Sequence, residues 1–483
     1  MTANGRPSAG KEAAALALHR FGFGPVGDSI TAIAADPRGA LLADLDHANA
    51  VQPNITSLPS SAEAAREVFD FRAAQSAMQK LTLRVQKETE TSGEAQAMSE
   101  LAKVPGLDDA APAQKPPQPP LPQQIIFNEA KARFDAATGA DIGFVERLVW
   151  FWSNHFCVSA DKEVAMAGAY EREAIRPHVL GRFASLLQAV ESHPAMLFYL
   201  DNVESMGADS IAGINRDKGL NENLARETLE LHTLGVRSGY SQTDVTSFAN
   251  VLTGWTWIRP EDPNHGGEFV FMKRLHQPGD QIVLGKRYPD TGVDQGRAVL
   301  ADLARNPATA HHIAEKLARH FVADEPPPAL VAKLTSTFRD TDGDLKQLAR
   351  SLVLSDESWN PQRQKLKSPA EWIAGVIRLG GAQSNIPIGR IMTAQAALGA
   401  PLWRPPAPNG FPDSEAAWLD GLPRRIDIAV DLSGRVPHAE PLALLEDGLG
   451  PLASPETRET VARAESRPQA LALLVMAPEF LRR

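Results

Sequence analysis

Apolar side chains recur along most of the chain at helical rather than alternating spacing. Segments 11–20, 62–88 and 144–156 carry them three and four positions apart, and Ala and Leu outnumber the β-branched residues that strands favour. Two short segments, 268–272 and 281–284, are β-like instead and lie between Gly or Pro turns. The pattern therefore predicts a mainly α-helical, multi-helix globular domain with a small β-hairpin insertion formed by these two segments.

Proline breaks the helical pattern most strongly between residues 89 and 123. Six prolines lie between residues 112 and 122, and such tracts favour extended, solvated backbone. We expect a linker or surface excursion here, with an N-terminal helical part of the main domain at 1–88. A helical core that carries the candidate site is expected at 124–360, and a C-terminal helical region packed on that core at 361–483. For a chain of 483 residues, one large domain then fits better than three independent ones.

Composition narrows the class of protein. The chain has 43% hydrophobic and 22% charged residues and a net charge of -10, which is typical of a globular protein and provides no basic field for nucleic acid. A single cysteine, Cys157, excludes a disulfide framework and a zinc site of several thiolates, and we expect its thiol to be buried and unreactive. No apolar run approaches the ~20 residues that span a bilayer, so no transmembrane segment is expected.

No nucleotide cofactor is expected. Residues 22–27 spell GxGxxG, but they follow a helix rather than a strand, and Pro25 lacks the N–H that a phosphate would bind. The N-terminus lacks the basic-then-apolar profile of a secretory signal, which favours a cytoplasmic location.

One histidine lies on the apolar face of the predicted 144–156 helix. His155 follows Leu148, Phe151 and Trp152 by seven, four and three positions, so it shares their face and is expected to be buried near the helix end. A buried imidazole is either satisfied within the core or used in a functional site. Both interpretations remain open at this point.

One glutamate lies on the apolar face of a second predicted helix, at 221–235. Leu224, Leu231 and Leu234 define the inward face of this helix, and Glu227 lies among them. A buried carboxylate needs a distant Arg partner, a metal ion, or a role in acid–base chemistry. The sequence does not choose among these three.

The other two acidic residues of this helix have a local partner. Arg226 lies four residues from both Glu222 and Glu230, which is the spacing of routine helical ion pairs. Glu227 has no comparable neighbour on its own helix. Its candidate long-range partners are two upstream arginines, Arg172 and Arg176.

Further histidines complete the set of candidates. His276 is expected on a loop after the 268–272 strand, where it can reach a ligand. His311, His312 and His320 share one predicted helix, but Lys316 breaks the metal-binding spacing there, and solvated positions are expected for the three histidines.

Several long motifs resemble the bacterial family known as domain of unknown function 1800. They are WFWSNHF at 150–156, HPAMLFYLDN at 193–202, NENLARETLELHTLG at 221–235, LTGW at 252–255, KLARHFV at 316–322 and an opening FGFGP at 21–25. The resemblance covers nearly the whole chain outside the proline-rich segment. It implies a mostly helical architecture and brings no established activity.

Matching the motifs of this family residue by residue implies a set of site positions. They are Asn154, His155, Asn202, Asn221, Glu222, Asn223, Arg226, Glu227, Glu230, Trp255 and His276. The resemblance also implies export, and a gene neighbour that encodes a sulfatase-like exported protein. This chain lacks the signal of its relatives, so export as a passenger on a partner, or from a different start site, is the alternative to a cytoplasmic location.

The leading hypothesis is an enzyme, with hydrolysis as the default reaction. The expected catalytic residues are His155, Glu227, Glu222 and Glu230. The expected substrate-binding residues are Asn154, Asn202, Asn221, Asn223, Arg226, Trp255 and His276. The site is expected either to act directly as acid and base or to hold one divalent metal at His155, Glu227 and His276. The rival hypothesis is a non-enzymatic accessory protein, partner of the sulfatase-like class, whose buried polar residues are structural.

Overall fold

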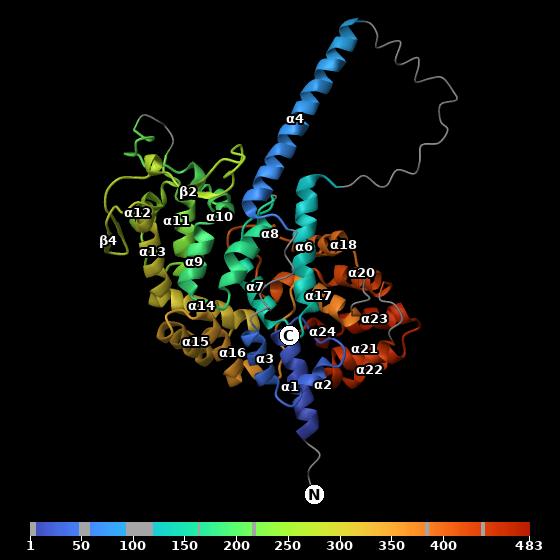
Figure 1. Cartoon of the computed structure of the whole chain (residues 1–483). Helices are drawn as coiled ribbons and strands as arrows, with labels where there is room; N and C mark the ends of the chain where they lie inside the picture. Colours follow the sequence, from blue (N-terminus) through green and yellow to red (C-terminus); the bar gives the residue numbers. More distant parts are fainter. Residues whose placement is uncertain are drawn as a thin grey trace.

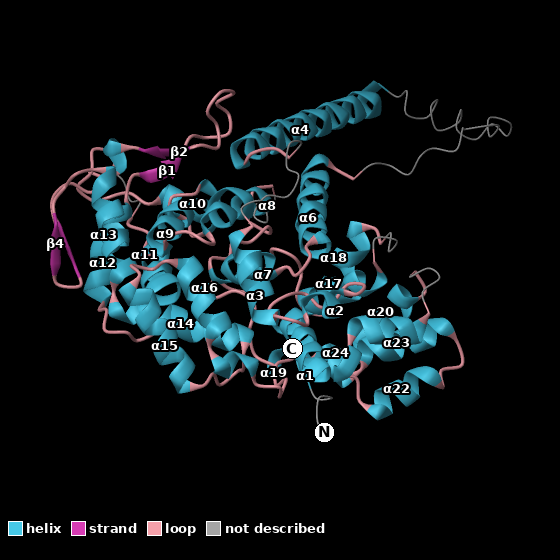
Figure 2. Ribbon diagram, turned by 60° about the horizontal axis from the view of Figure 1, so that its bottom comes forward, coloured by secondary structure: helices cyan, strands magenta, loops and turns pink. Residues whose placement is uncertain are grey.

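The computed structural model describes residues 6–47, 58–92, 119–162, 165–214, 219–381, 386–435 and 440–483. These residues are mainly α-helical, as the hydrophobic pattern predicts, and their paired strands form two short hairpins. Figure 2 shows helices throughout the body and the strands near one edge.

The first third of the chain supplies the centre and one end of the molecule (Figure 1). Its elements are α1 (Arg6–Arg20), α2 (Ser29–Ile33), α3 (Pro37–Asp46), α4 (Ser61–Ser92), α6 (Leu121–Gly139), α7 (Phe144–His155), α8 (Ala167–Tyr170), the π-helix η2 (Glu171–Ile175) and the 3-10 turn η3 (Arg176–His178). Of the proline-rich segment predicted at 89–123, residues 89–92 belong to α4 and 121–123 to α6, whereas 93–118 lie outside the described residues.

The middle of the chain packs against one side of this centre (left in Figure 1). Its helical elements are α9 (Phe183–Glu191), α10 (Pro194–Tyr199), η4 (Asn202–Glu204), α11 (Asn223–Glu227), the π-helix η5 (Thr228–Thr233), α12 (Gln242–Leu252), η6 (Lys273–Leu275), α13 (Val293–Arg305), α14 (Pro307–Phe321), α15 (Pro328–Asp340), α16 (Leu345–Leu354) and η7 (Asp356–Trp359). Its strands are β1 (Trp255–Trp257), β2 (Phe269–Phe271), β3 (Gln281–Val283) and β4 (Lys286–Tyr288).

The C-terminal part covers the opposite side (right in Figure 1). Its elements are α17 (Pro369–Gly380), α18 (Ile388–Ala397), α19 (Ala416–Leu419), α20 (Leu422–Ser433), α21 (Pro441–Gly448), η8 (Gly450–Leu452), α22 (Pro455–Ala462), α23 (Arg467–Met476) and α24 (Pro478–Leu481). Within the fold, α17 packs on α6 and η8 packs on α1, so the two ends of the chain meet.

The strands pair differently from the single predicted hairpin. Both predicted segments contain a strand, but β2 pairs with β1 and β3 pairs with β4, each antiparallel. A two-residue turn returns the chain at once after β3, because Leu284 and Gly285 both have positive φ, at 51° and 74°. The prediction that the two segments pair with each other is therefore wrong.

The helix that ends at His155 begins on a carboxylate from another helix. Gly143 precedes α7 with a φ of 86°, and Asp44 of α3 accepts hydrogen bonds from the amides of Phe144 (3.0 Å) and Val145 (3.2 Å). A carboxylate at a helix N-terminus satisfies free N–H groups and matches the helix dipole. This contact fixes where α7 starts, and so where its last residue, His155, lies.

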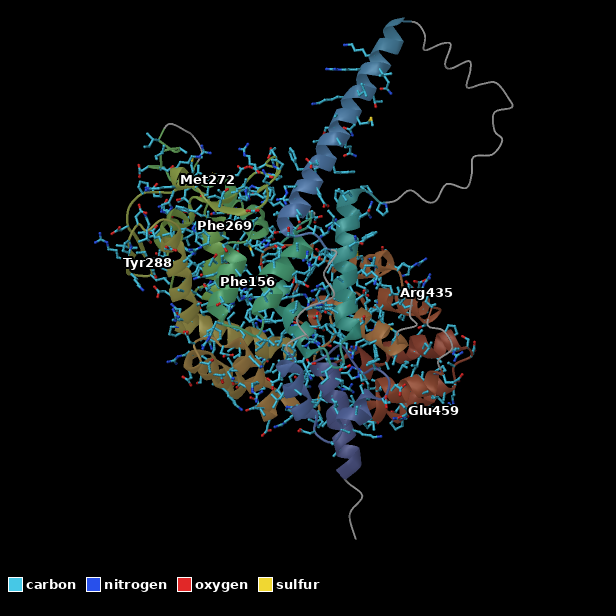
Figure 3. The ribbon with its side chains drawn as sticks, viewed as in Figure 1. Phe156, Phe269, Met272, Tyr288, Arg435 and Glu459 are labelled. Atoms are coloured by element: carbon cyan, nitrogen blue, oxygen red, sulfur yellow. The ribbon has the colours of Figure 1, made fainter. Side chains whose placement is uncertain are left out.

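One buried hydrophobic cluster runs through all three parts of the chain. It contains Phe21 near the N-terminus, Trp152 and Phe183 in the centre, and Trp372 and Leu474 of the C-terminal part, each with an exposed fraction of 1% or less. Figure 3 shows Phe156, of the same cluster, within the body, while Phe269, Met272 and Tyr288 lie toward the edge that carries the hairpins.

α4 is the exception to this compact packing. Its first turns pack on α6 and α8 through a small separate cluster that includes Ala64 and Val68, and the rest of the helix stands clear of the body (Figures 1 and 3). Met78, Leu81 and Leu83 are each more than half exposed there. No helix of the described ranges, α4 included, has the length and apolar character needed to cross a bilayer.

Candidate functional site

A π turn in the helix predicted at 221–235 moves a histidine into the core. α11 continues directly as η5, in which the hydroxyl of Thr233 donates to the carbonyl of Thr228 (2.6 Å). A π turn holds one more residue than an α turn, so the residues after it are rotated about the axis. Leu231, predicted to face inward, is only partly buried, while His232 is buried.

His232 joins a buried carboxylate to His155. Its Nδ1 lies 2.6 Å from Oε1 of Glu191 on α9, with both side chains buried, and its backbone carbonyl lies 3.2 Å from Nε2 of His155. A carbonyl can only accept a hydrogen bond, so Nε2 of His155 donates and its Nδ1 keeps a lone pair. This contact sets the tautomer of His155.

The lone-pair nitrogen of His155 has no partner. The imidazole is buried at the end of α7, as predicted, and Nδ1 makes no hydrogen bond among the described residues. Burial, and after it the positive charge of nearby Lys316, lowers the pKa of His155 well below its usual value. The ring is therefore neutral at physiological pH and presents an unused acceptor.

A polar cavity of about 170 Å³ adjoins His155. It lies between the last turns of α7, the C-terminal half of α14 and the loop before α19. Its lining residues are Phe151, Asn154, His155, Lys316, Arg319, His320, Asn409, Phe411, Pro412 and Asp413. A volume of this size holds several water molecules or a small polar group.

Lys316 brings a positive charge to this cavity without a paired anion. Its side chain is largely buried on α14, and its ammonium forms neither a hydrogen bond nor an ion pair with any described residue. Burial lowers the pKa of Lys316 to about 8, although the negative charge of Asp413 acts in the opposite direction. Lys316 is thus mostly protonated at neutral pH and loses its proton as the pH rises through about 8.

One wall of the cavity, formed by His320 and Asp413, is backed by an ionic cluster. Asp413 lies 2.9 Å from Nδ1 of His320 and 3.3 Å from the ammonium of Lys365. Glu371 lies 2.8 Å from Arg147 and 3.0 Å from Arg483. Burial raises the pKa of Glu371, but the two arginines outweigh it and hold that pKa at about 2.

Two of the three histidines expected on a solvated face are turned inward. The ring of His320 is mostly buried against Asp413, and His312 lies 3.1 Å from the carbonyl of Leu231. Only His311 is exposed. The solvated positions expected for His312 and His320 are wrong because α14 is covered on this face by η5 and by the loop before α19.

An aromatic cavity of about 120 Å³ lies beside the polar one. The two share Asn154, His320, Phe411 and Pro412 as lining residues. The remaining lining is mainly apolar: Trp150, Val158, Ala400, Leu402, Trp403, Pro405 and Trp418, with Arg133, Ser153, Cys157, Ser368, Ala370, Glu371 and Gln395 between them.

Glu227 lines neither of these cavities. Its carboxylate is half-buried and has no hydrogen bond or ion pair among the described residues. Burial raises the pKa of Glu227, and its charge in turn raises that of the Cys157 thiol, which burial already takes to about 12. The thiol is thus buried and protonated, as expected.

The two arginines considered as partners of Glu227 pair with other carboxylates. Arg172 lies 2.6 Å from Glu129, and Arg176 lies 2.5 Å from Glu146. The structure therefore excludes Arg172 and Arg176 as ion-pair partners of the Glu227 carboxylate.

The two acidic neighbours of Glu227 on the same helix, Glu222 and Glu230, form hydrogen bonds with other side chains. Glu222 accepts hydrogen bonds from Arg226 (2.9 Å), from Gln242 and from Thr246. Glu230 accepts from the hydroxyl of Tyr240 (2.8 Å). The local pairing of Glu222 with Arg226 is confirmed, and catalytic roles for Glu222 and Glu230 stay predictions.

Three of the four predicted asparagine side chains form hydrogen bonds with backbone groups. The amide of Asn154 exchanges two hydrogen bonds with the backbone of Phe411, at 3.0 and 2.8 Å, and so forms the partition between the two cavities. Asn221 accepts from the amide of Asn223 (2.9 Å) at the start of α11, and Asn223 itself is exposed. Asn202 donates to the carbonyls of Leu252 and Trp255. Substrate binding by these four side chains stays a prediction.

His276 and Trp255 lie by the hairpins. His276 is buried, with Nδ1 2.8 Å from the carbonyl of Thr253 and Nε2 3.6 Å from Asp290. Trp255 is buried against Gly296 of α13. Neither residue lines the polar or the aromatic cavity.

The three candidate metal ligands contact different neighbours. His155 contacts His232, His276 contacts Thr253, and Glu227 contacts neither histidine through a hydrogen bond. Within the part of the chain that the structure describes, no three His, Cys, Asp or Glu side chains gather as a metal site would require. The predicted ligand set does not fit a metal ion.

The sequence analysis missed Lys316 and Asp413 as site residues. Lys316 lies four residues from both His312 and His320, three after Ile313 and one before Leu317, so the test that selected His155 would have placed it on the inward face of α14. Asp413 lies in a loop, where periodicity carries no signal.

A model of one protein family matches residues 16–482, and its description reads protein of unknown function (DUF1800). No curated protein and no solved structure matches the chain.

Proposed function

Because the chain belongs to the family described as protein of unknown function DUF1800, a description that names no activity, we propose a function from the geometry of its polar cavity. The chain is a hydrolase, and the polar cavity is its active site. One observation carries the proposal: the imidazole of His155, whose buried Nδ1 has no partner, and the unpartnered side chain of Lys316 line the same cavity.

These two groups supply what hydrolysis needs. Nδ1 of His155 takes a proton from a water molecule while the water oxygen bonds to the electrophilic carbon, phosphorus or sulfur atom of the substrate. The ammonium of Lys316 stabilises the negative charge that develops on the substrate oxygen. His155 then returns the proton to the leaving group as the bond to that group breaks, so His155 ends as it began.

The protonation states match these roles. His155 is neutral at physiological pH and can accept a proton, and Lys316, with a pKa of about 8, is mostly charged there. The charge of Lys316 also disfavours a long-lived imidazolium, which favours passing the proton on to the leaving group. No step is assigned to a metal ion.

The missing partner of Lys316 provides a test that distinguishes a functional lysine from a structural one. Lys367, which is buried without a carboxylate, has a hydrogen-bond acceptor in Nδ1 of His19 (2.9 Å), whereas the partly buried ammonium of Lys316 has neither a carboxylate nor an acceptor among the described residues, and such a group lowers the free energy of unfolding. Lys316→Met should therefore raise the midpoint of thermal unfolding while it lowers hydrolytic activity. The loss expected for one charge-stabilising donor is about 100-fold or more.

The experiment compares wild type with Lys316→Met, His155→Gln and Glu227→Gln against chromogenic ester, amide, phosphate and sulfate substrates, with thermal unfolding in parallel. Lys286→Met is the matched control, because Lys286 is exposed and pairs with Asp302. This control should change neither the hydrolytic activity nor the midpoint of thermal unfolding. A Lys316→Met protein that keeps wild-type activity would overturn the proposal. A Lys316→Met protein that unfolds at a lower temperature would also overturn it, because Lys316 would then stabilise the fold, and this outcome can be measured even when no substrate of the panel is turned over.

A second candidate function, that of an accessory protein, is favoured by α4. This helix projects from the body with Met78, Leu81 and Leu83 exposed, as a helix that binds another protein would (Figure 1). The partner implied by the family resemblance is a sulfatase-like exported protein. Co-expression with such a gene neighbour, followed by size-exclusion chromatography, should give a complex that Met78→Glu with Leu81→Glu abolishes. Two separate peaks for the wild-type pair would contradict it.

A further inference from the structure

The aromatic cavity holds buried polar atoms that nothing in the described chain satisfies. The indole N–H groups of Trp150 and Trp403 and the side-chain oxygen of Gln395 have no hydrogen-bond partner. Each of the three residues is more than nine-tenths buried, and each lines this cavity. Unsatisfied buried polar groups destabilise a fold, so three of them around one cavity indicate a missing partner.

The three atoms specify the hydrogen-bonding groups of that partner. An indole N–H can only donate, so Trp150 and Trp403 require an acceptor on the ligand. The oxygen of Gln395 can only accept, so it requires a donor. A carboxamide carries both, with an oxygen that accepts from the two indoles and an N–H that donates to Gln395.

The charges around the cavity favour an uncharged ligand. Arg133 stacks over the ring of Trp150 at 4.2 Å and is paired with Glu171 at 2.8 Å. The carboxylate of Glu371 is paired with Arg147 and Arg483. Because the ionised groups of the lining already have opposite charges beside them, an additional ion would enter without a partner.

The size and the lining of the aromatic cavity indicate what the rest of the ligand is. The cavity, at about 120 Å³, is slightly smaller than the ~150 Å³ apolar cavity that accepts benzene, but it is partly open to solvent, so a ligand of one ring and a carboxamide extends into its opening. Trp418, Leu402 and Val158 provide the apolar surface for such a group. We propose that the aromatic cavity binds a small uncharged amide, in which an apolar group no larger than one ring carries a carboxamide.

This binding site is independent of the proposed hydrolysis. The pair of hydrogen bonds between Asn154 and Phe411 separates the two cavities, and neither His155 nor Lys316 lines the aromatic one. Binding at this site therefore persists in Lys316→Met, whatever the activity of that variant.

Isothermal titration calorimetry tests the proposal with three probes of similar shape. Benzamide carries the carboxamide, benzoate carries a charge, and toluene lacks polar atoms. Wild type should bind benzamide roughly tenfold or more tightly than the other two, as expected for one to two additional satisfied hydrogen bonds. Equal affinity for benzamide and toluene, or no benzamide binding at millimolar concentration, overturns the proposal and leaves ordered water as the occupant.

Variants then locate the site. Gln395→Leu should weaken benzamide binding about tenfold and leave toluene binding unchanged, because it removes only the acceptor. Ala400→Leu fills the cavity and should abolish binding of both. Gln347→Leu is the matched control on an exposed position and should bind as wild type does. Benzamide affinity that Ala400→Leu, folded by circular dichroism, leaves unchanged would place the ligand elsewhere and contradict the proposal.

Discussion

Most buried ionisable side chains in the described residues meet an opposite charge or, as Lys367 does at Nδ1 of His19, a hydrogen-bond acceptor, and Lys316 meets neither. Arg147 meets Glu371, and Arg176 meets Glu146, in each case within 3 Å. Such pairs offset the desolvation of both members. An ammonium left without a pair at the edge of a cavity has no structural explanation, and this makes Lys316 the most informative residue of the candidate site.

The pKa of Lys316 predicts how hydrolysis depends on pH. If the ammonium form is required, the rate is constant below about pH 8 and falls by about tenfold per pH unit above it, because burial lowers the pKa of Lys316 to about 8. Initial rates between pH 6 and 10 measure this. Arginine stays protonated over the whole range, so whatever activity Lys316→Arg retains should not decline. A wild-type rate that is level from pH 7 to 10 contradicts the assignment.

Residue-scale features could be predicted from the sequence only where the cause is local. The burial of His155 follows from its spacing to Leu148, Phe151 and Trp152 on one helix, and the structure confirms it. The partners of His155 do not follow, because the carbonyl of His232 and the ammonium of Lys316 come from segments 77 and 161 residues away. No spacing within one helix carries that information.

At the scale of elements, helices were predictable and their irregularities were not. The 144–156 helix was predictable because its apolar residues recur at one period. The π turn at Thr228–Thr233 was not, since it changes the register by one residue without changing the composition. The same holds for the hairpins, whose pairing depends on the tight turn at Leu284 and Gly285 rather than on strand propensity.

The start of α7 depends on one side chain from another element. Asp44→Ala leaves the amides of Phe144 and Val145 without their acceptor and should lower the free energy of unfolding by about 1–2 kcal/mol. Asp44→Asn keeps an acceptor oxygen and should cost less. Urea unfolding of the two variants checks the order. Equal losses for Ala and Asn would show that the negative charge, rather than the hydrogen bonds, holds the helix start.

At the scale of the molecule, one ionic cluster joins the centre to the C-terminal part. Glu371 of α17 bridges Arg147 of α7 and Arg483, and the amide of Arg483 donates to the carbonyl of Lys365 (2.9 Å). These residues lie behind the polar cavity, so they hold its wall in place. The sequence could not predict this cluster, because its members lie up to 336 residues apart.

Removing the charge of Glu371 should be costly. Glu371→Gln leaves the buried guanidinium of Arg147 without its anion and leaves Arg483 only Asp413, at 3.8 Å, so we expect a loss of about 3–5 kcal/mol at pH 7 by urea unfolding. The folded-state pKa of Glu371 is held at about 2, so its contribution is present above pH 4.5 and is lost as the pH falls toward 2. The difference between wild type and variant should shrink over that window.

Glu459→Gln is the matched control. Glu459 and its partner Arg463 are both more than half exposed, and the change there should stay within about 0.5 kcal/mol. A loss at Glu371 no larger than at Glu459 would contradict a bridging role for the cluster.

The projecting part of α4 has a consequence for how the molecule opens. The side chains between residues 72 and 84 are exposed, so little tertiary packing protects the backbone there, and local helix propensity is its main support. Amide hydrogens of this stretch should exchange with solvent far faster than those of α7, and a protease should cut it first. We therefore expect unfolding in two steps that differ greatly in free energy. The projecting part of α4 unfolds first and locally, and the body unfolds later as one cooperative unit.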